Sequence, residues 1–189
     1  MKKGPLMKQK ELFQKIRNTL EGFGLNITAP PEEEAKLPFQ ALIASFGTDE
    51  EERPLALQVL QYSKQIEAAL MPEGEIKETP IDINIISFIM TVPVEVKSEC
   101  LQEVLSLVAL MNKALPLGSF NYSDTEKVVY YSYNFPICVD PPSEMILLTI
   151  IQTILFAKDT FITVIEDIST GKETIASFLE TLNEPLPAK

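Results

Sequence analysis

Apolar and polar positions alternate along five segments of the chain, with the period of two that is typical of β-strands. Short polar turns join the first of these segments to the second and the fourth to the fifth, as in β-hairpins. Strands that are joined by short turns run antiparallel. The pattern therefore predicts one antiparallel sheet of about five strands, at residues 38–46, 55–66, 81–94, 119–123 and 127–136.

Four other segments repeat apolar residues at spacings of three and four, which predicts amphipathic helices. These helices are expected at residues 6–23, 98–115, 143–168 and 174–182, and the pattern leaves open a break near Asp159. In the second helix Ser98 is the expected N-cap. Its apolar stripe, which should face the core, consists of Leu101, Val104, Leu105, Val108, Met111 and Leu115.

One-sided apolar stripes place helices against a sheet, so we expect an α+β fold whose helices pack mainly on one face. The chain has 189 residues, of which 46% are hydrophobic and 23% charged, and its mean hydropathy is +0.09. These are the proportions of an ordinary globular protein. We expect residues 1–36 to form an N-terminal helix and linker and residues 37–189 to form a single α+β domain.

The segment 143–168 has more apolar residues than one helix face holds. Its apolar run, 145–157, is shorter than the roughly 20 residues that a membrane-spanning helix needs. We therefore expect this helix to form part of the core or a protein interface. Four of the excess residues, together with two tyrosines of the predicted strand 127–136, are the candidate protein-binding residues: Ile146, Leu147, Ile150, Ile154, Tyr130 and Tyr133. For the tyrosines, strand packing is the alternative. An uncovered apolar helix also favours a two-fold homodimer.

The formal charge is −11, with a sequence pI near 4.5. Such a surface repels phosphate backbones, so we expect no nucleic-acid partner and favour basic or amphipathic protein segments. Six basic residues near the start form either an arm for a membrane or nucleic acid, or a solvated helix start, which we favour. No apolar run with a cleavage site follows Met7, so we expect a cytoplasmic protein without a membrane partner.

The residues for common catalytic sites are missing from the sequence. It has no histidine, and its glycines match neither the dinucleotide-binding nor the P-loop pattern. The carboxylate clusters 32–34 and 49–52 lie in predicted loops, and Cys100 and Cys138 are read as reduced structural residues. We therefore expect no enzyme, no catalytic residues, no cofactor and no metal site.

A motif spans the end of the predicted helix 98–115 and the hairpin after it. It reads Leu110-Met-Asn112-Lys-Ala-Leu115-Pro116-Leu117-Gly118-Ser-Phe120, followed by Tyr122, Asp124, Val128 and Tyr130. This motif resembles the signature of the YbjN-like proteins, and the order of elements resembles theirs over about residues 37–170. YbjN-like proteins resemble type III secretion chaperones in fold. The resemblance implies a small, acidic, cytoplasmic homodimer that holds unfolded protein segments along its sheet and apolar patches.

The expected function is therefore that of a non-enzymatic protein-binding domain, chaperone-like or adaptor, that holds a segment of a protein whose identity the sequence does not give. The segment binds either by adding a strand to a sheet edge or by lying on an apolar patch. The alternative is a small-molecule sensing or regulatory domain with a pocket between the sheet and the helices.

Overall fold

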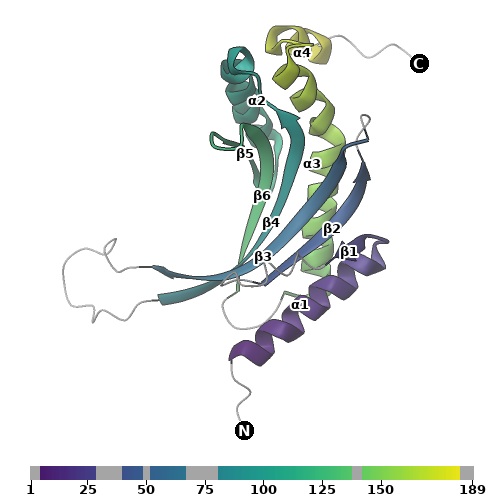
Figure 1. The fold of residues 1–189 in the computed structure, drawn as a ribbon, viewed down its shortest axis with the longest axis vertical. Helices are drawn as coiled ribbons and strands as arrows, with labels where there is room; N and C mark the ends of the chain where they lie inside the picture. The colour runs from purple at the N-terminus through teal and green to yellow at the C-terminus, as the bar shows by residue number, and fades with distance from the viewer. Residues whose placement is uncertain (1–4, 29–39, 49–51, 67–80, 138–141, 184–189) are drawn as a thin grey trace, which may run out of the picture. The chain divides into compact units, whose positions relative to one another are not determined.

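The computed structural model describes residues 5–28, 40–48, 52–66, 81–137 and 142–183. Over these residues the chain forms helices and one sheet, an α+β fold as predicted (Figure 1). The helices are α1 (Pro5–Gly22), the 3-10 helix η3 (Ser98–Cys100), α2 (Leu101–Ala114), α3 (Glu144–Thr170) and α4 (Ile175–Asn183). The strands are β1 (Asn26–Thr28), β2 (Gln40–Thr48), β3 (Pro54–Ile66), β4 (Ile81–Glu95), β5 (Ser119–Ser123) and β6 (Val128–Ile137).

The described strands form one six-stranded antiparallel sheet in the order β1-β2-β3-β4-β6-β5. The five predicted strands correspond to β2 to β6, and residues 38 and 39 of the first prediction lie outside the described residues. The remaining strand, β1, lies in the segment that was expected to be the linker after the N-terminal helix. It has three residues and pairs antiparallel with β2, where Ile27 lies opposite Ala44.

The end of α1 explains how β1 reaches the sheet. Gly24 has a φ of 79°, which glycine adopts without strain, and the main-chain N–H of Leu25 donates to the carbonyl of Leu20 at 3.2 Å. The chain thus turns sharply out of α1, which ends at Gly22, and enters β1 at Asn26 after three residues.

The chain divides into two compact units, and several elements contribute residues to both. The first unit contains Met1–Phe46, Ala56–Ile89 and Asn134–Thr149, and the second contains Gly47–Leu55, Met90–Tyr133 and Ile150–Lys189. The single domain expected at residues 37–189 stays a prediction.

Each unit buries apolar side chains of its own. In the first unit Ile16, Leu57 and Phe88 are fully buried, and in the second Leu107, Tyr131 and Ile165 are. From Phe88 to Val94 the burial along β4 alternates. Val92 is fully buried, whereas its neighbours Thr91 and Pro93 are half-buried, so one face of this strand forms the core.

Helix α2 buries a narrower stripe than the sequence predicted. Val104, Leu107 and Met111 are buried, but Leu105 is 41% exposed and Val108 is half-buried. The assignment of Leu105 to the core is therefore wrong. The N-cap prediction is also wrong, because Ser98 begins η3, and α2 starts after Cys100 without a side-chain cap.

Helix α3 is continuous, so the break that the sequence left open near Asp159 is absent. It has 27 residues, and its most apolar window of 18 residues has a mean hydropathy of 1.7, with 33% of that window buried. By length and composition alone this helix is long enough to cross a membrane, contrary to the expectation from its apolar run. The core helix of a soluble protein also has these properties, and Ile150, Ile154 and Ile165 of α3 are core residues here. The fold is consistent with a soluble protein.

Two neighbouring substitutions in α2 test which stripe is the core. Val104→Asp places a charge at a fully buried position and should lower the free energy of unfolding by about 3 kcal/mol or more. Leu105→Asp places the same charge at a 41% exposed position and should cost less than about 1 kcal/mol. Urea unfolding of both variants measures the difference. Equal losses would contradict the observed orientation of α2.

Candidate functional site

The motif of residues 110–120 forms one connected unit at the junction of α2 and β5. The side-chain amide of Asn112 donates to the carbonyl of Phe120 at 2.9 Å, and the N–H of Phe120 donates to Asn112 Oδ1 at 2.8 Å. One side chain in the last turn of α2 thus bonds both main-chain polar groups of one residue in β5. Leu115, in the turn between them, is buried.

Gly118 allows this turn to pass close to β6. Its φ is 69°, a conformation that favours glycine, and a Cβ at this position would collide with the ring and hydroxyl of Tyr131. The hydroxyl of Tyr131 donates to the carbonyl of Leu117 at 2.8 Å. The turn is therefore fastened to α2 through Asn112 and to β6 through Tyr131.

An aromatic chain extends from the motif to the surface of α3. The rings of Phe120 and Tyr131 lie 5.4 Å apart in an edge-to-face arrangement, and Phe120 and Phe161 lie 5.8 Å apart in the same way. Phe161 in turn meets Phe156 at 6.5 Å. Phe156 is 54% exposed, so the chain links a buried aromatic core to solvent.

Burial also changes the chemistry of Tyr131. The side chain is fully buried, and this desolvation, with a smaller contribution from Tyr133, raises its pKa from 10.0 to about 12. The phenol therefore keeps its proton, and its hydrogen bond to Leu117, to a higher pH than an ordinary tyrosine does. Its role in this arrangement is structural.

The six candidate protein-binding residues of the sequence do not form one surface. Leu147, Ile150 and Ile154 are between 0% and 2% exposed, so they belong to the core and are closed to a partner. Tyr130 and Tyr133 are half-buried. Only Ile146 is exposed, at 41%. Three of the four candidate residues on α3 are therefore buried in the core.

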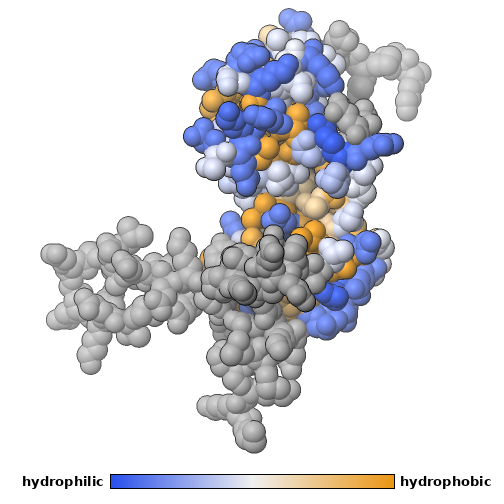
Figure 2. Space-filling view, viewed as in Figure 1, coloured by the Kyte–Doolittle hydropathy of each residue, from blue (hydrophilic) through white to orange (hydrophobic). Residues whose placement is uncertain are grey.

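An apolar stripe on α2 was not predicted as a surface. Leu101, Leu105 and Val108 recur at four and three residues, and none of them is buried. Figure 2 shows apolar side chains among hydrophilic ones on the part of the molecule that carries α2. We call Leu101, Leu105 and Val108 the outer α2 stripe.

The other flank of α2 is occupied by α4. The main-chain N–H of Ile175, the first residue of α4, donates to Glu103 Oε2 at 2.9 Å, so a side chain of α2 caps the N-terminus of α4. Glu103 lies on the opposite side of α2 from Leu105, because two positions along a helix differ by about 200°. The outer α2 stripe therefore faces away from the contact with α4.

The sequence contains one signal that distinguishes the two stripes. Gln102 and Ser106, three positions before Leu105 and one after it, are polar. Both stripes nevertheless repeat apolar residues at spacings of three and four: Leu101, Leu105 and Val108 in one, and Val104, Leu107 and Met111 in the other. This signal is weak, because apolar residues occupy both stripes.

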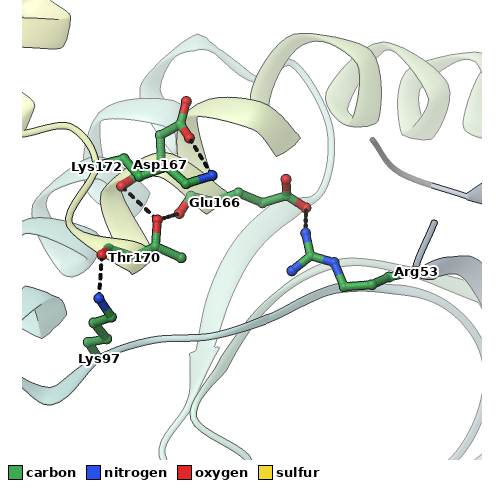
Figure 3. A network of polar contacts seen from close by, with 6 residues as sticks. All are labelled: Arg53, Lys97, Glu166, Asp167, Thr170 and Lys172. Atoms are coloured by element: carbon green, nitrogen blue, oxygen red, sulfur yellow. Dashed lines mark hydrogen bonds and ion pairs between the residues drawn. The ribbon is translucent and has the colours of Figure 1, made fainter. Parts of the chain in front are cut away.

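A network of polar contacts holds the C-terminal end of α3 in the second unit (Figure 3). Lys97 Nζ donates to the carbonyl of Thr170 at 2.7 Å, and the hydroxyl of Thr170 donates to the carbonyl of Glu166 at 2.8 Å. The guanidinium of Arg53 donates to the carboxylate of Glu166 at 2.7 Å. Carbonyl groups in the last turn of a helix lack intrahelical donors, and Lys97 supplies one.

A hollow of about 350 Å³ lies beside this network. Most of its walls are polar or charged, and the lining residues are Thr48, Leu55, Lys158, Asp159, Ile162, Thr163 and Glu166. The charges are already paired. Lys158 forms an ion pair with Asp159 at 2.8 Å, and Glu166 pairs with Arg53. The polar lining of this hollow differs from that of typical small-molecule sites, which are mostly apolar with a few polar groups.

A hollow in the first unit is also lined by polar side chains. It measures about 460 Å³, and its walls are Gln14, Lys15, Asn18, Thr19 and Glu144. Lys15 is held there by a hydrogen bond from its Nζ to the carbonyl of Pro142 at 3.0 Å.

No group of three or more His, Cys, Asp or Glu side chains in the described part of the chain is placed to hold a metal ion. Cys100 is half-buried, and its thiol is free. The carboxylates 32–34 and 49–51 and the thiol of Cys138 lie outside the described residues. Glu52, the last residue of the second cluster, is exposed.

The fold and this junction define an α+β protein with an antiparallel sheet, a fastened helix-to-strand turn and an apolar stripe on the adjoining helix. Comparison with protein-family models, curated proteins and solved structures finds no match to this chain. The YbjN-like resemblance therefore stays a prediction.

The raised pKa of Tyr131 predicts a specific loss of stability in alkali. A phenol with a higher pKa in the folded state holds its proton more tightly there, so its contribution is fully present below pH 10.0 and is lost as the pH rises toward about 12. The free energy of unfolding should fall over this range by about 2 to 3 kcal/mol more in the wild type than in Tyr131→Phe. Denaturant unfolding between neutral pH and pH 12 measures both slopes. Parallel slopes would show that the phenol titrates normally.

Proposed function

We propose that the protein is a non-enzymatic protein-binding domain, chaperone-like or adaptor, that holds a segment of another protein. The observation that carries this proposal is the outer α2 stripe. A surface helix usually presents one apolar stripe to the core and polar residues to solvent. Helix α2 has a buried stripe and, beside it, a second apolar stripe with Leu105 at 41% exposure.

The neighbouring strand favours one of the two binding modes that the sequence left open. Strand addition at β5 requires free outward main-chain groups, and those of Phe120 are already bonded to Asn112. An amphipathic segment that lies on the outer α2 stripe requires no main-chain groups. At the β5 edge, next to α2, the contacts therefore support binding through side chains.

The charge supports a basic partner. With a formal charge of −11, the chain attracts basic segments over long range and repels acidic ones. In a segment with apolar residues on one face and Lys or Arg on the other, the apolar face can pack on the outer α2 stripe and the basic residues are attracted by the negative charge of the chain.

The YbjN-like resemblance supports the remaining parts of the proposal. Its motif residues Asn112, Gly118 and Phe120 lie together in one junction. If the chain shares the properties of the chaperones that this family resembles, it is a cytoplasmic homodimer. On the part of α3 that belongs to the second unit, Phe156 is the exposed apolar residue left for self-association after burial of Ile150 and Ile154.

A small-molecule regulatory domain is the second candidate, and the volume of the hollow beside Lys158 favours it, whereas the polar lining of that hollow does not. Its volume of about 350 Å³ falls at the lower end of the range for ligand sites. A ligand there would have to displace the ion pair between Lys158 and Asp159.

A holding assay tests the main proposal. A chemically denatured model protein is diluted from guanidinium chloride, and its aggregation is followed by light scattering with and without this protein. We expect near-equimolar protein to delay aggregation, and Leu105→Ser to lose most of the effect, because Leu105 is the most exposed residue of the stripe.

The matched control is Leu179→Ser on α4, where leucine is 37% exposed but lies off the stripe. It should hold the model protein as well as the wild type does. Retention of activity in Leu105→Ser, or no delay by the wild type at a large molar excess, would contradict the proposal.

The homodimer is tested separately by multi-angle light scattering over a range of micromolar concentrations. We expect the mass of two chains, since a two-fold pair is the commonest way to cover an apolar surface. Phe156→Ser removes an exposed aromatic ring and should shift the equilibrium toward one chain. The mass of one chain at every concentration would contradict the dimer and leave the holding activity to be judged by its own assay.

A further inference from the structure

Strand β5 is an edge strand of the described sheet, because the strand order ends with β6-β5. Its partner β6 occupies one side only. In an antiparallel pair, alternate residues direct their main-chain N–H and C=O groups away from the partner strand. At an edge these groups are free to pair with a strand of another chain, which is a route to aggregation.

The register shows which residues of β5 point outward. Phe120 lies opposite Tyr131 and Tyr122 lies opposite Val129. Because both main-chain groups of Phe120 reach Asn112 on α2, Phe120 is an outward residue, and Tyr122, two positions later, is the next one. Ser119 and Asn121 then direct their main-chain groups toward β6.

The side chain of Asn112 makes the two hydrogen bonds with the Phe120 main chain that a neighbouring strand would otherwise make. A carboxamide has one N–H₂ donor and one C=O acceptor, the same pair of groups as a peptide bond. Both are used here, at 2.9 Å and 2.8 Å, on one residue of the edge. The distances are those of good main-chain hydrogen bonds.

Packing holds this carboxamide in place. Asn112 follows the buried Met111 and lies three residues before the buried Leu115, so the last turn of α2 is anchored on both sides. Helix α2 and β5 also lie side by side in the second unit (Figure 1). No strand has to be ordered to fill this position, because a core helix already supplies the group.

We propose that Asn112 acts as a built-in substitute for an added strand and keeps the β5 edge closed to pairing with β5 of a second copy of this chain. A five-residue strand has few outward residues, so capping one of them removes much of the hydrogen bonding that an added strand gains. The inference does not rest on the proposed function.

The experiment compares Asn112→Ala with the wild type by sedimentation velocity over a range of concentrations, and by amide hydrogen exchange. We expect the Phe120 amide to exchange at least about tenfold faster in dilute Asn112→Ala, since its acceptor is gone. As the concentration rises, the variant should form species of higher mass than the wild type. The Tyr122 amide serves as an internal reference for an uncapped outward group.

Asn121→Ala is the matched control. Asn121 lies in β5 and its amide donates to Ser132 Oγ at 3.0 Å and to the Ser119 carbonyl at 3.1 Å, but it does not cap an outward group. It should keep the oligomeric state of the wild type. If Asn112→Ala fails to fold, Asn112→Asp takes its place, because the carboxylate keeps an acceptor for the Phe120 N–H and lacks the donor for the carbonyl.

A double variant identifies the edge as the site of association. Tyr122→Pro removes an outward N–H that does not bond β6, so in the Asn112→Ala background it should abolish the extra association, while Tyr122→Ala should not. If Asn112→Ala and Asn112→Asp keep the wild-type mass at every concentration, or if Tyr122→Ala and Tyr122→Pro act alike, the proposal is overturned.

Discussion

The two hydrogen bonds between the Asn112 carboxamide and the Phe120 main chain hold the end of α2 against the edge of the sheet. Other contacts depend on this position. It sets where the intervening turn runs, so that the Leu117 carbonyl meets the Tyr131 hydroxyl, and it directs the Phe120 ring inward against Tyr131 and Phe161. Helix, turn, strand and aromatic core are therefore coupled through one polar side chain.

This coupling gives α2 three distinct sides. One side buries Val104, Leu107 and Met111, and another caps α4 through Glu103. The remaining side carries the outer stripe and ends at Asn112, which follows Leu105 and Val108 at helical spacing. A surface for a partner on this side lies on a helix that is fixed at both flanks, so binding would require little ordering of the main chain.

The local pattern predicted the helices and five of the six strands, because hydrophobic periodicity and turn residues act within a few positions of each other. It missed β1, since three residues contain too little alternation and their strand structure comes from pairing with β2, a distant contact. On α2 and α3 the sequence showed that apolar residues were plentiful but not which ones were covered. Leu105 was assigned to the core and is exposed, whereas Ile150 and Ile154 were assigned to a partner surface and are buried. Whether an apolar residue is buried depends on contacts with distant parts of the chain, and helical periodicity does not determine those contacts.

The close approach of Gly118 to Tyr131 limits which amino-acid substitutions this chain can accept in evolution. The tyrosine ring and hydroxyl occupy the volume that any side chain at position 118 would need, and a φ of 69° already disfavours other residues there. Losing the hydroxyl alone would not make room, because the ring carbon that bears it is also in the way. A smaller residue at position 131 would remove only part of the obstacle, because the Ser132 carbonyl oxygen would still lie 2.9 Å from a Cβ at position 118 and the φ of 69° would remain. Glycine at 118 is therefore required by the main chain as well as by the tyrosine, and replacing the tyrosine alone does not free this position to change.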